Sequence, residues 1–175
     1  MLSQSQIDTF NANGYVNGGK VLSDDAVEVL RSEIMRTIEE RDRADVPQPV
    51  MVHNFSKDEG APVWQIVDIW MSSPPFRALI SHPKITEGLA QLTGASELRI
   101  WHDQIQYKPA QVGGVNMWHQ DAPYWPIIAP MTEVTGWVAL DDADEDNGCM
   151  SMVPGSHLWG NNIDFLHTFK SYEDM

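Results

Sequence analysis

The ten residues "NMWHQDAPYW" (116–125) are the part of the chain from which the rest can be interpreted. His119 and Asp121 stand two positions apart among aromatic and turn-forming residues. With six His and fifteen Asp in 175 residues, roughly half of one H-x-D is expected by chance, so the spacing alone does not decide their role. The two could be half of a metal site, or His119 could be a core histidine and Asp121 the cap of the turn before Pro123.

An extended backbone over 117–121 would favour the metal site. Side chains alternate between the two faces of an extended segment, so His119 and Asp121 would share one face and Gln120 would point away. A histidine from another strand would complete a 2-His-1-carboxylate triad, which is diagnostic of non-haem Fe(II) oxygenases. That triad leaves three positions on the iron for a cosubstrate and O2.

The first half of the chain is expected to be mostly helical. Ser3 or Ser5 can cap a short helix that runs through Phe10. A longer helix is predicted over 23–43 with Ser23 as its N-cap, and one or two short helices over 74–94 end at Gly94. The apolar stripe of the long helix has spacings of three and four residues and consists of Val27, Leu30, Ile34 and Ile38.

The second half changes to strand-like patterns. Alternating and β-branched residues predict strands over 97–108, 134–140 and 148–157, with Gly and Pro between them. Helices followed by short strands indicate an α+β fold with a β-sandwich or jelly roll in the C-terminal half.

Four blocks of sequence together resemble the phytanoyl-CoA dioxygenase family, a branch of the Fe(II)/2-oxoglutarate-dependent oxygenases. They are "HDQIQYKPA" (102–110), "WHQDAPYW" (118–125), "VTGWVALDDADEDNGCM" (134–150) and "VPGSH" (153–157). The resemblance is dense from about residue 97 to 160, and "IDTFNANGYV" (7–16) is similar to the family's opening. It implies N-terminal helices followed by a double-stranded β-helix, or jelly roll, and an enzyme that uses Fe(II), 2-oxoglutarate and O2.

The resemblance also implies roles for individual residues. His119 and Asp121 match two of the family's three iron ligands. Trp137 and Gln104 match positions that contact 2-oxoglutarate. Gln65 falls where some relatives carry a lysine that contacts this cosubstrate, and the glutamine lacks the charge of that lysine. Neighbours of the ligands are expected to border the substrate pocket, which is mostly apolar in such proteins: Met117, Tyr124 and Trp125.

Two parts of the family's site are not evident in this chain. The third iron ligand is a histidine well beyond the P-G-S-H turn, but His157 lies in the turn itself and His167 in an apolar connection, so neither is expected to bind iron. In the family an arginine after the third ligand binds the distal carboxylate of 2-oxoglutarate. Every arginine of this sequence precedes His119, so no arginine of the chain matches that position. Three or four strands after Ser96 also fall short of the eight of a jelly roll.

We therefore expect a single domain over 1–175, with a helical part at about 1–95 and a jelly-roll part at about 96–175 that lacks its last strands. The prediction is a dioxygenase that hydroxylates a small organic substrate with release of succinate and CO2, although the 175-residue chain alone would be inactive. The alternative is a catalytically incomplete domain that binds a small molecule or a metal on the same scaffold. Exposed strand edges could pair with a missing C-terminal segment or with a second copy.

Composition limits the compartment and the partners. A formal charge of −14 disfavours nucleic acid and anionic membranes as partners, and no apolar stretch approaches the length of a membrane span. The lone Cys149 and the absence of a signal-peptide pattern favour the cytoplasm.

Other chemistries fit the sequence less well. If Asp142 were position 1 of a calcium loop, position 6 would be Asn147 instead of glycine and position 12 would be Val153 instead of glutamate, so a calcium site is not supported. The stretch "VPGSH" is not a nucleophile elbow. Zinc stays possible with His and Asp ligands, although structural zinc favours cysteines. A related halogenase is disfavoured because such enzymes replace the aspartate, which is present here as Asp121.

Overall fold

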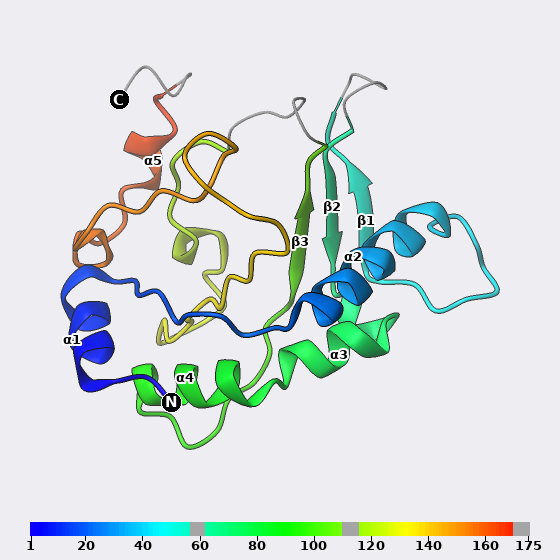
Figure 1. Cartoon of the computed structure of the whole chain (residues 1–175). Coiled ribbons are helices and arrows are strands. Elements are labelled where there is room, and N and C mark those ends of the chain that lie inside the picture. Colours follow the sequence, from blue (N-terminus) through cyan, green and yellow to red (C-terminus); the bar gives the residue numbers. More distant parts are fainter. Residues whose placement is uncertain (57–61, 110–115, 170–175) are drawn as a thin grey trace. The chain divides into compact units, whose positions relative to one another are not determined.

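The computed structural model describes residues 1–56, 62–109 and 116–169 (Figure 1). Its elements combine helices with one antiparallel sheet, so the fold is of the mixed α+β kind. In chain order they are α1 (Gln4–Asn13), α2 (Asp24–Glu39), β1 (Met51–Asn54), β2 (Trp64–Val67), the 3-10 helix η1 (Ile69–Met71), α3 (Pro74–Ile80), α4 (Pro83–Thr93), β3 (Gln104–Tyr107), the 3-10 helices η2 (Ala122–Tyr124) and η3 (Ser156–Leu158), and α5 (Ile163–Leu166).

The chain divides into two compact units. The first, here called the sheet unit, comprises Lys20–Glu87 and Ser96–Gly113, and the second, the terminal unit, comprises Met1–Gly19, Gly88–Ala95 and Gly114–Met175. Among the described residues no helix is long and apolar enough to cross a membrane.

Helix α2 supplies half of the buried apolar side chains of the sheet unit. Ser23 accepts the Ala26 N–H at 3.3 Å, as predicted for an N-cap, and two aspartates occupy the first turn, where the helix dipole favours negative charge. Leu30, Ile34 and Ile38 are buried, which confirms the predicted apolar stripe except that Val27 is only half-buried.

The sheet has the order β1-β2-β3, and both pairs are antiparallel. Ile66 in the central strand lies opposite Val52 on one side and Ile105 on the other, and its side chain is fully buried. Ile69 in η1 and Phe76 in α3 complete the core of this unit. Burial of these apolar side chains is the main force that holds the sheet unit together.

Asp68 turns the chain from β2 into η1. Its backbone has φ +58, the left-handed conformation, which Asp tolerates better than most residues. The Asp68 N–H donates to the Asp103 carbonyl at 3.0 Å, and the Asp68 carboxylate accepts the Trp70 indole N–H at 3.0 Å. The first bond joins the end of β2 to the residue that precedes β3, and the second fixes the side chain of Trp70 in η1.

The terminal unit is built differently. Ser3 and Gln6 form a capping box at the start of α1, and Gly14 ends the helix with φ +85. A Cβ on Gly14 would lie 2.5 Å from Nδ1 of His157, so only glycine fits between this helix end and the P-G-S-H turn. None of the unit's described side chains is buried; Gly88, which has none, is its one buried residue.

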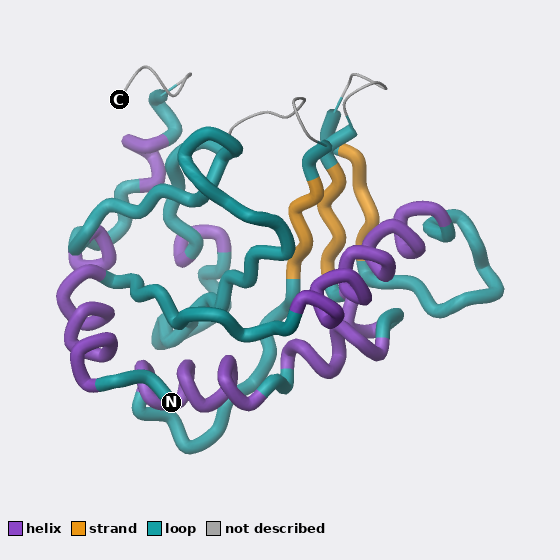
Figure 2. The backbone as a smooth tube through the Cα atoms, in the orientation of Figure 1, coloured by secondary structure: helices purple, strands orange, loops and turns teal. Residues whose placement is uncertain are grey.

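The strand predictions need correction. Of the strand expected over 97–108 only Gln104–Tyr107 forms, and 134–140 and 148–157 form no strand, so most of the chain after β3 is loop (Figure 2). Conversely, β1 and β2 lie within the part expected to be helical, about 1–95. A strand requires a hydrogen-bonded neighbour, and nothing in the described residues pairs with 134–140. The jelly roll therefore stays a prediction.

Removal of the central core side chain tests this account of the sheet unit. Ile66→Ala leaves a cavity at a fully buried position, so we expect the free energy of unfolding to fall by about 2–5 kcal/mol. Ile127→Ala is the control, because Ile127 is 77% exposed and its loss should change stability by less than about 0.5 kcal/mol. Urea unfolding of both variants gives the comparison, and equal losses would contradict the assignment of the core.

Asp103 should make stability depend on pH. Burial raises the pKa of its carboxyl to about 6, with a smaller contribution from the charge of Asp68, while the amides of Trp70 and Ile69 partly offset the shift. Neither carboxyl oxygen has a hydrogen-bond partner of good geometry. Between pH 4 and 6 the folded chain therefore holds a proton that the unfolded chain has released, and stability falls as the pH rises through this window.

The variant Asp103→Asn removes this proton uptake. We expect it to match the parent chain near pH 4 and to be more stable near pH 7 by about 1 kcal/mol, a modest value because a half-buried charge is partly screened. Urea unfolding at both pH values measures the difference, with the exposed Asp142→Asn as control. A parent chain whose stability rises from pH 4 to pH 7 relative to Asp103→Asn would refute the account.

Candidate metal-binding segment

His119 and Asp121 lie on one short segment of the terminal unit that has no regular structure before η2. The Asp121 carbonyl accepts the Tyr124 N–H at 2.9 Å and so begins the 3-10 turn, with φ −72 and ψ −44 at Asp121. The backbone is therefore not extended through Asp121. The ψ angle of Asp121 changes only the course of the chain after its Cα atom. The turn therefore does not move the Asp121 side chain away from that of His119.

The two side chains meet directly. Nε2 of His119 lies 3.3 Å from Oδ1 of Asp121, and both side chains are about half exposed, at 45% and 48%. The hydrogen bond with Asp121 raises the pKa of His119, partial burial opposes this shift, and the bond to Met117 adds to it.

The other ring nitrogen of His119 is fixed by the backbone. Nδ1 lies 2.7 Å from the carbonyl oxygen of Met117, and a carbonyl can only accept a hydrogen bond, so Nδ1 carries a proton. In the neutral ring Nε2 then has a lone pair that faces the carboxylate of Asp121. Two electron-rich atoms at this separation need a positive charge, which is either a second proton on the ring or a cation held by both.

Gln120 engages a different segment from its two neighbours. Its Nε2 donates to the Gly160 carbonyl at 2.8 Å, and its Oε1 accepts the Asn162 N–H at 2.6 Å. The side chain between His119 and Asp121 therefore anchors their segment to residues 160–162.

Tyr124 makes a second link to the C-terminal region. Its hydroxyl lies 3.0 Å from Nε2 of His167, just after α5, and its ring centroid lies 6.4 Å from that of His119. Sequence reasoning missed both this link and the one made by Gln120, because contacts over about 40 residues leave no local pattern.

The remaining predicted residues fall in different places. Trp137 is in the terminal unit with His119 and Asp121, and its side chain is 54% exposed. Gln65 and Gln104 are in the sheet unit, where the register pairs Gln65 with Gln106 and Val67 with Gln104. Paired residues share a face of a sheet, so the two predicted cosubstrate contacts lie on the same face.

The neighbours of the pair differ in exposure. Met117 and Trp125 are half-buried, whereas Tyr124 is 52% exposed. Among the residues that the structure describes, no group of three or more His, Cys, Asp or Glu is placed to hold a metal ion. His157 lies in η3 against Gly14, and His167 faces Tyr124.

Comparison with known proteins gives a family. The sequence model described as "Phytanoyl-CoA dioxygenase (PhyH)" matches residues 10–174. The ectoine dioxygenase of Bordetella bronchiseptica is 27% identical over 159 residues, which are 89% of this chain and 50% of that protein. The peroxisomal phytanoyl-CoA dioxygenase of Mus musculus is 26% identical over 166 residues, which are 90% of this chain and 48% of that protein.

A solved structure is also similar. The non-heme alpha-ketoglutarate-dependent carbocyclase SnoK from nogalamycin biosynthesis matches 60% of this chain and 38% of its own at 24% identity, with a TM-score of 0.48. The present chain spans about half the length of the two dioxygenases.

The anchor formed by Gln120 gives a test of the local structure. Gln120→Ala removes the acceptor of the Asn162 N–H, so we expect amide exchange at Asn162 to become about two- to tenfold faster, as for the loss of one hydrogen bond. Gln120→Glu keeps an acceptor for the Asn162 N–H but replaces the donor to the Gly160 carbonyl with a second oxygen, so it should retain only part of the protection. Hydrogen exchange followed by NMR measures both, and unchanged exchange in Gln120→Ala would show that the anchor does not form.

Proposed function

Because the chain belongs to the phytanoyl-CoA dioxygenase family, we propose that it is part of a non-haem Fe(II)/2-oxoglutarate-dependent dioxygenase that hydroxylates a small organic substrate. Iron and 2-oxoglutarate follow from the family, while the activity of the whole protein is our inference. The observation that carries it in this chain is the approach of His119 Nε2 to Asp121 Oδ1 at 3.3 Å.

That distance suits two ligands of one metal ion. Donors about 2.1–2.2 Å from an ion and at right angles to each other lie about 3.0–3.1 Å apart, close to the observed separation. Metal-binding histidines usually donate their other ring N–H to a carbonyl or carboxylate, as His119 does to Met117. The residues present therefore fit Fe(II), and Asp121 would offset part of its charge.

A complete site would also need a third iron ligand, contacts to 2-oxoglutarate and a substrate pocket. We infer that the third iron ligand and a carboxylate-binding arginine come from residues outside this sequence. Trp137, Gln104 and Gln65 are proposed to contact 2-oxoglutarate; Gln65 offers a hydrogen bond where a lysine would offer a charge. Met117, Tyr124 and Trp125 are proposed to border the substrate.

Bound iron would couple the oxidative decarboxylation of 2-oxoglutarate to succinate and CO2 with hydroxylation of the substrate by O2. This chain would contribute positioning. The Met117 carbonyl fixes the ring of His119, and Gln120 holds the backbone of the segment against residues 160–162. Since His119 and Asp121 are half exposed here, the exclusion of water that such chemistry needs would come from further residues or from the substrate.

The relatives support only a broad substrate class. One is named for ectoine and another for phytanoyl-CoA, which share little chemistry. We therefore propose hydroxylation of a C–H bond in a small organic molecule and no particular compound.

Turnover of 2-oxoglutarate tests this proposal. The full-length protein with Fe(II) should release succinate, and Asp121→Ala should reduce the rate by at least about a hundredfold, since removal of a ligand costs more than loss of an outer partner. Asp142→Ala, another exposed aspartate, is the control and should keep the parent rate. Equal rates in the parent protein and Asp121→Ala would refute the role of Asp121.

A second candidate is a non-catalytic metal- or ligand-binding domain on the same scaffold. It is favoured by the absence of a third ligand among the described residues. Calorimetric titration of the 175-residue chain with Mn(II) tests whether the metal site of this chain is complete. Weak binding is expected if the site is incomplete, whereas tight one-to-one binding would mean that this chain holds a full site and would contradict our view of a missing ligand.

A further inference from the structure

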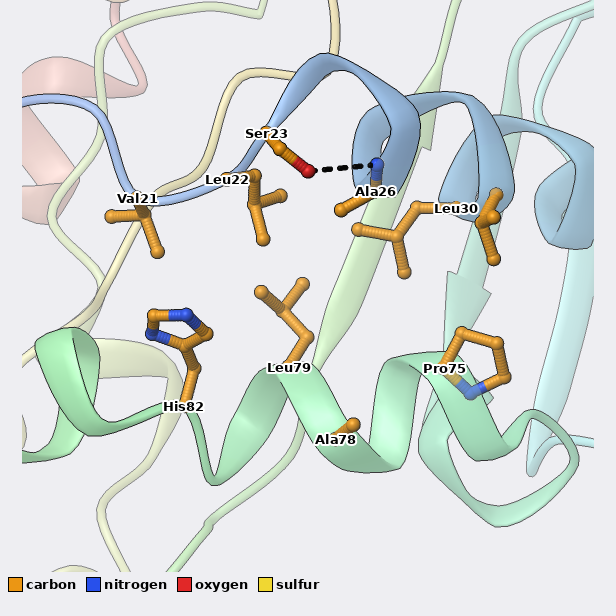
Figure 3. Close-up of a pocket in the computed structure, with 10 residues that line it drawn as sticks. Val21, Leu22, Ser23, Ala26, Leu30, Pro75, Ala78, Leu79 and His82 are labelled. Atoms are coloured by element: carbon orange, nitrogen blue, oxygen red, sulfur yellow. Dashed lines mark hydrogen bonds between the residues drawn. The ribbon is translucent and has the colours of Figure 1, made fainter.

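A cavity of about 400 Å³ lies in the sheet unit between the start of α2 and the helix α3 (Figure 3). Leu22, Ala26 and Leu30 line it from one side, and Ala78 and Leu79 from the other, with the ring of His82 at one end. The residues that line it all belong to the sheet unit, which contains neither His119 nor Asp121.

The size and lining of the cavity fit a small apolar molecule. Sites for small molecules typically have volumes of about 300–1,000 Å³ and mostly apolar walls with a few polar groups. The cavity has about the volume of one helical turn with its side chains, so it is small for a docked helix. No residue with a charged carboxylate, ammonium or guanidinium lines it, so an ionised ligand would lose hydration without gaining a partner.

The two polar side chains on the wall can both donate. Nδ1 of His82 accepts the Lys84 N–H at 3.3 Å, so the proton of the neutral ring is on Nε2. The Ser23 hydroxyl oxygen accepts the Ala26 N–H at 3.3 Å, which leaves its O–H hydrogen to donate. A ligand that satisfies either donor must carry an acceptor.

We propose that this cavity binds a small, uncharged, mainly apolar molecule with one oxygen acceptor, such as a ketone or an ester. The apolar body lies between Leu22 and Leu79, and the oxygen accepts from Nε2 of His82. The site does not depend on iron, on 2-oxoglutarate or on the proposed activity.

Titration of the whole chain with octan-2-one, followed by NMR of methyl and imidazole groups, tests the site. Saturable shifts of the Leu22, Leu79 and His82 signals are expected. Ala78→Trp places a large ring at the exposed mouth of the cavity without touching the core, and it should abolish these shifts. Met35→Trp, at a 41% exposed position of α2 that does not line the cavity, should leave them unchanged.

Two further comparisons test the recognition of the oxygen. His82→Phe keeps an aromatic ring at the end of the cavity but removes the Nε2 donor, so octan-2-one should bind about five- to tenfold more weakly while toluene, which has no acceptor, should not. Octanoate should bind more weakly than octan-2-one. The proposal is overturned if no shift saturates, if Ala78→Trp binds like the parent chain, or if octanoate binds more tightly than octan-2-one. It is also overturned if His82→Phe leaves the binding of octan-2-one unchanged or weakens toluene as much as octan-2-one.

Discussion

The hydrogen bond between Nδ1 of His119 and the Met117 carbonyl determines what the proposed site can do. Because the carbonyl only accepts, the bond commits the proton of the neutral ring to Nδ1 and presents a bare Nε2 to Asp121. That pair is stable only with a positive charge beside it. A second proton on the ring or a bound cation can supply this charge, and Fe(II) would supply it in the proposed enzyme, so metal and proton would compete for the position between Nε2 and Oδ1.

Burial is unevenly distributed between the two units. The sheet unit buries Leu30, Ile34, Ile38, Ile66, Ile69 and Phe76, whereas the described part of the terminal unit buries no side chain. The segments of the terminal unit are therefore held in place by hydrogen bonds, such as those of Gln120 and Tyr124, and not by a buried core. Hydrogen bonds can hold His119 and Asp121 beside each other, but they leave large apolar side chains such as Trp137 and Trp159 exposed.

Local signals were sufficient for the capped ends of the helices, whereas the extended backbone from which His119 and Asp121 were predicted to share a face does not continue through Asp121. Ser3, Ser23 and Gly94 mark helix ends through caps that depend only on neighbouring residues. Strands were predicted poorly. Residues 134–140 have the composition of a strand but no described partner, and β2 has its second partner, β3, about 40 residues later in the chain. The long-range bonds of Gln120 and the cavity beside His82 follow from packing, which a single sequence does not encode locally.

The most direct test of the central claim is a crystal structure of the full-length protein with Mn(II) and 2-oxoglutarate, with anomalous scattering used to locate the metal. Our account predicts one strong peak about 2.1–2.3 Å from both Nε2 of His119 and Oδ1 of Asp121, with Nδ1 still bonded to the Met117 carbonyl. A peak bound by other side chains, with His119 and Asp121 still in contact only with each other, would contradict it.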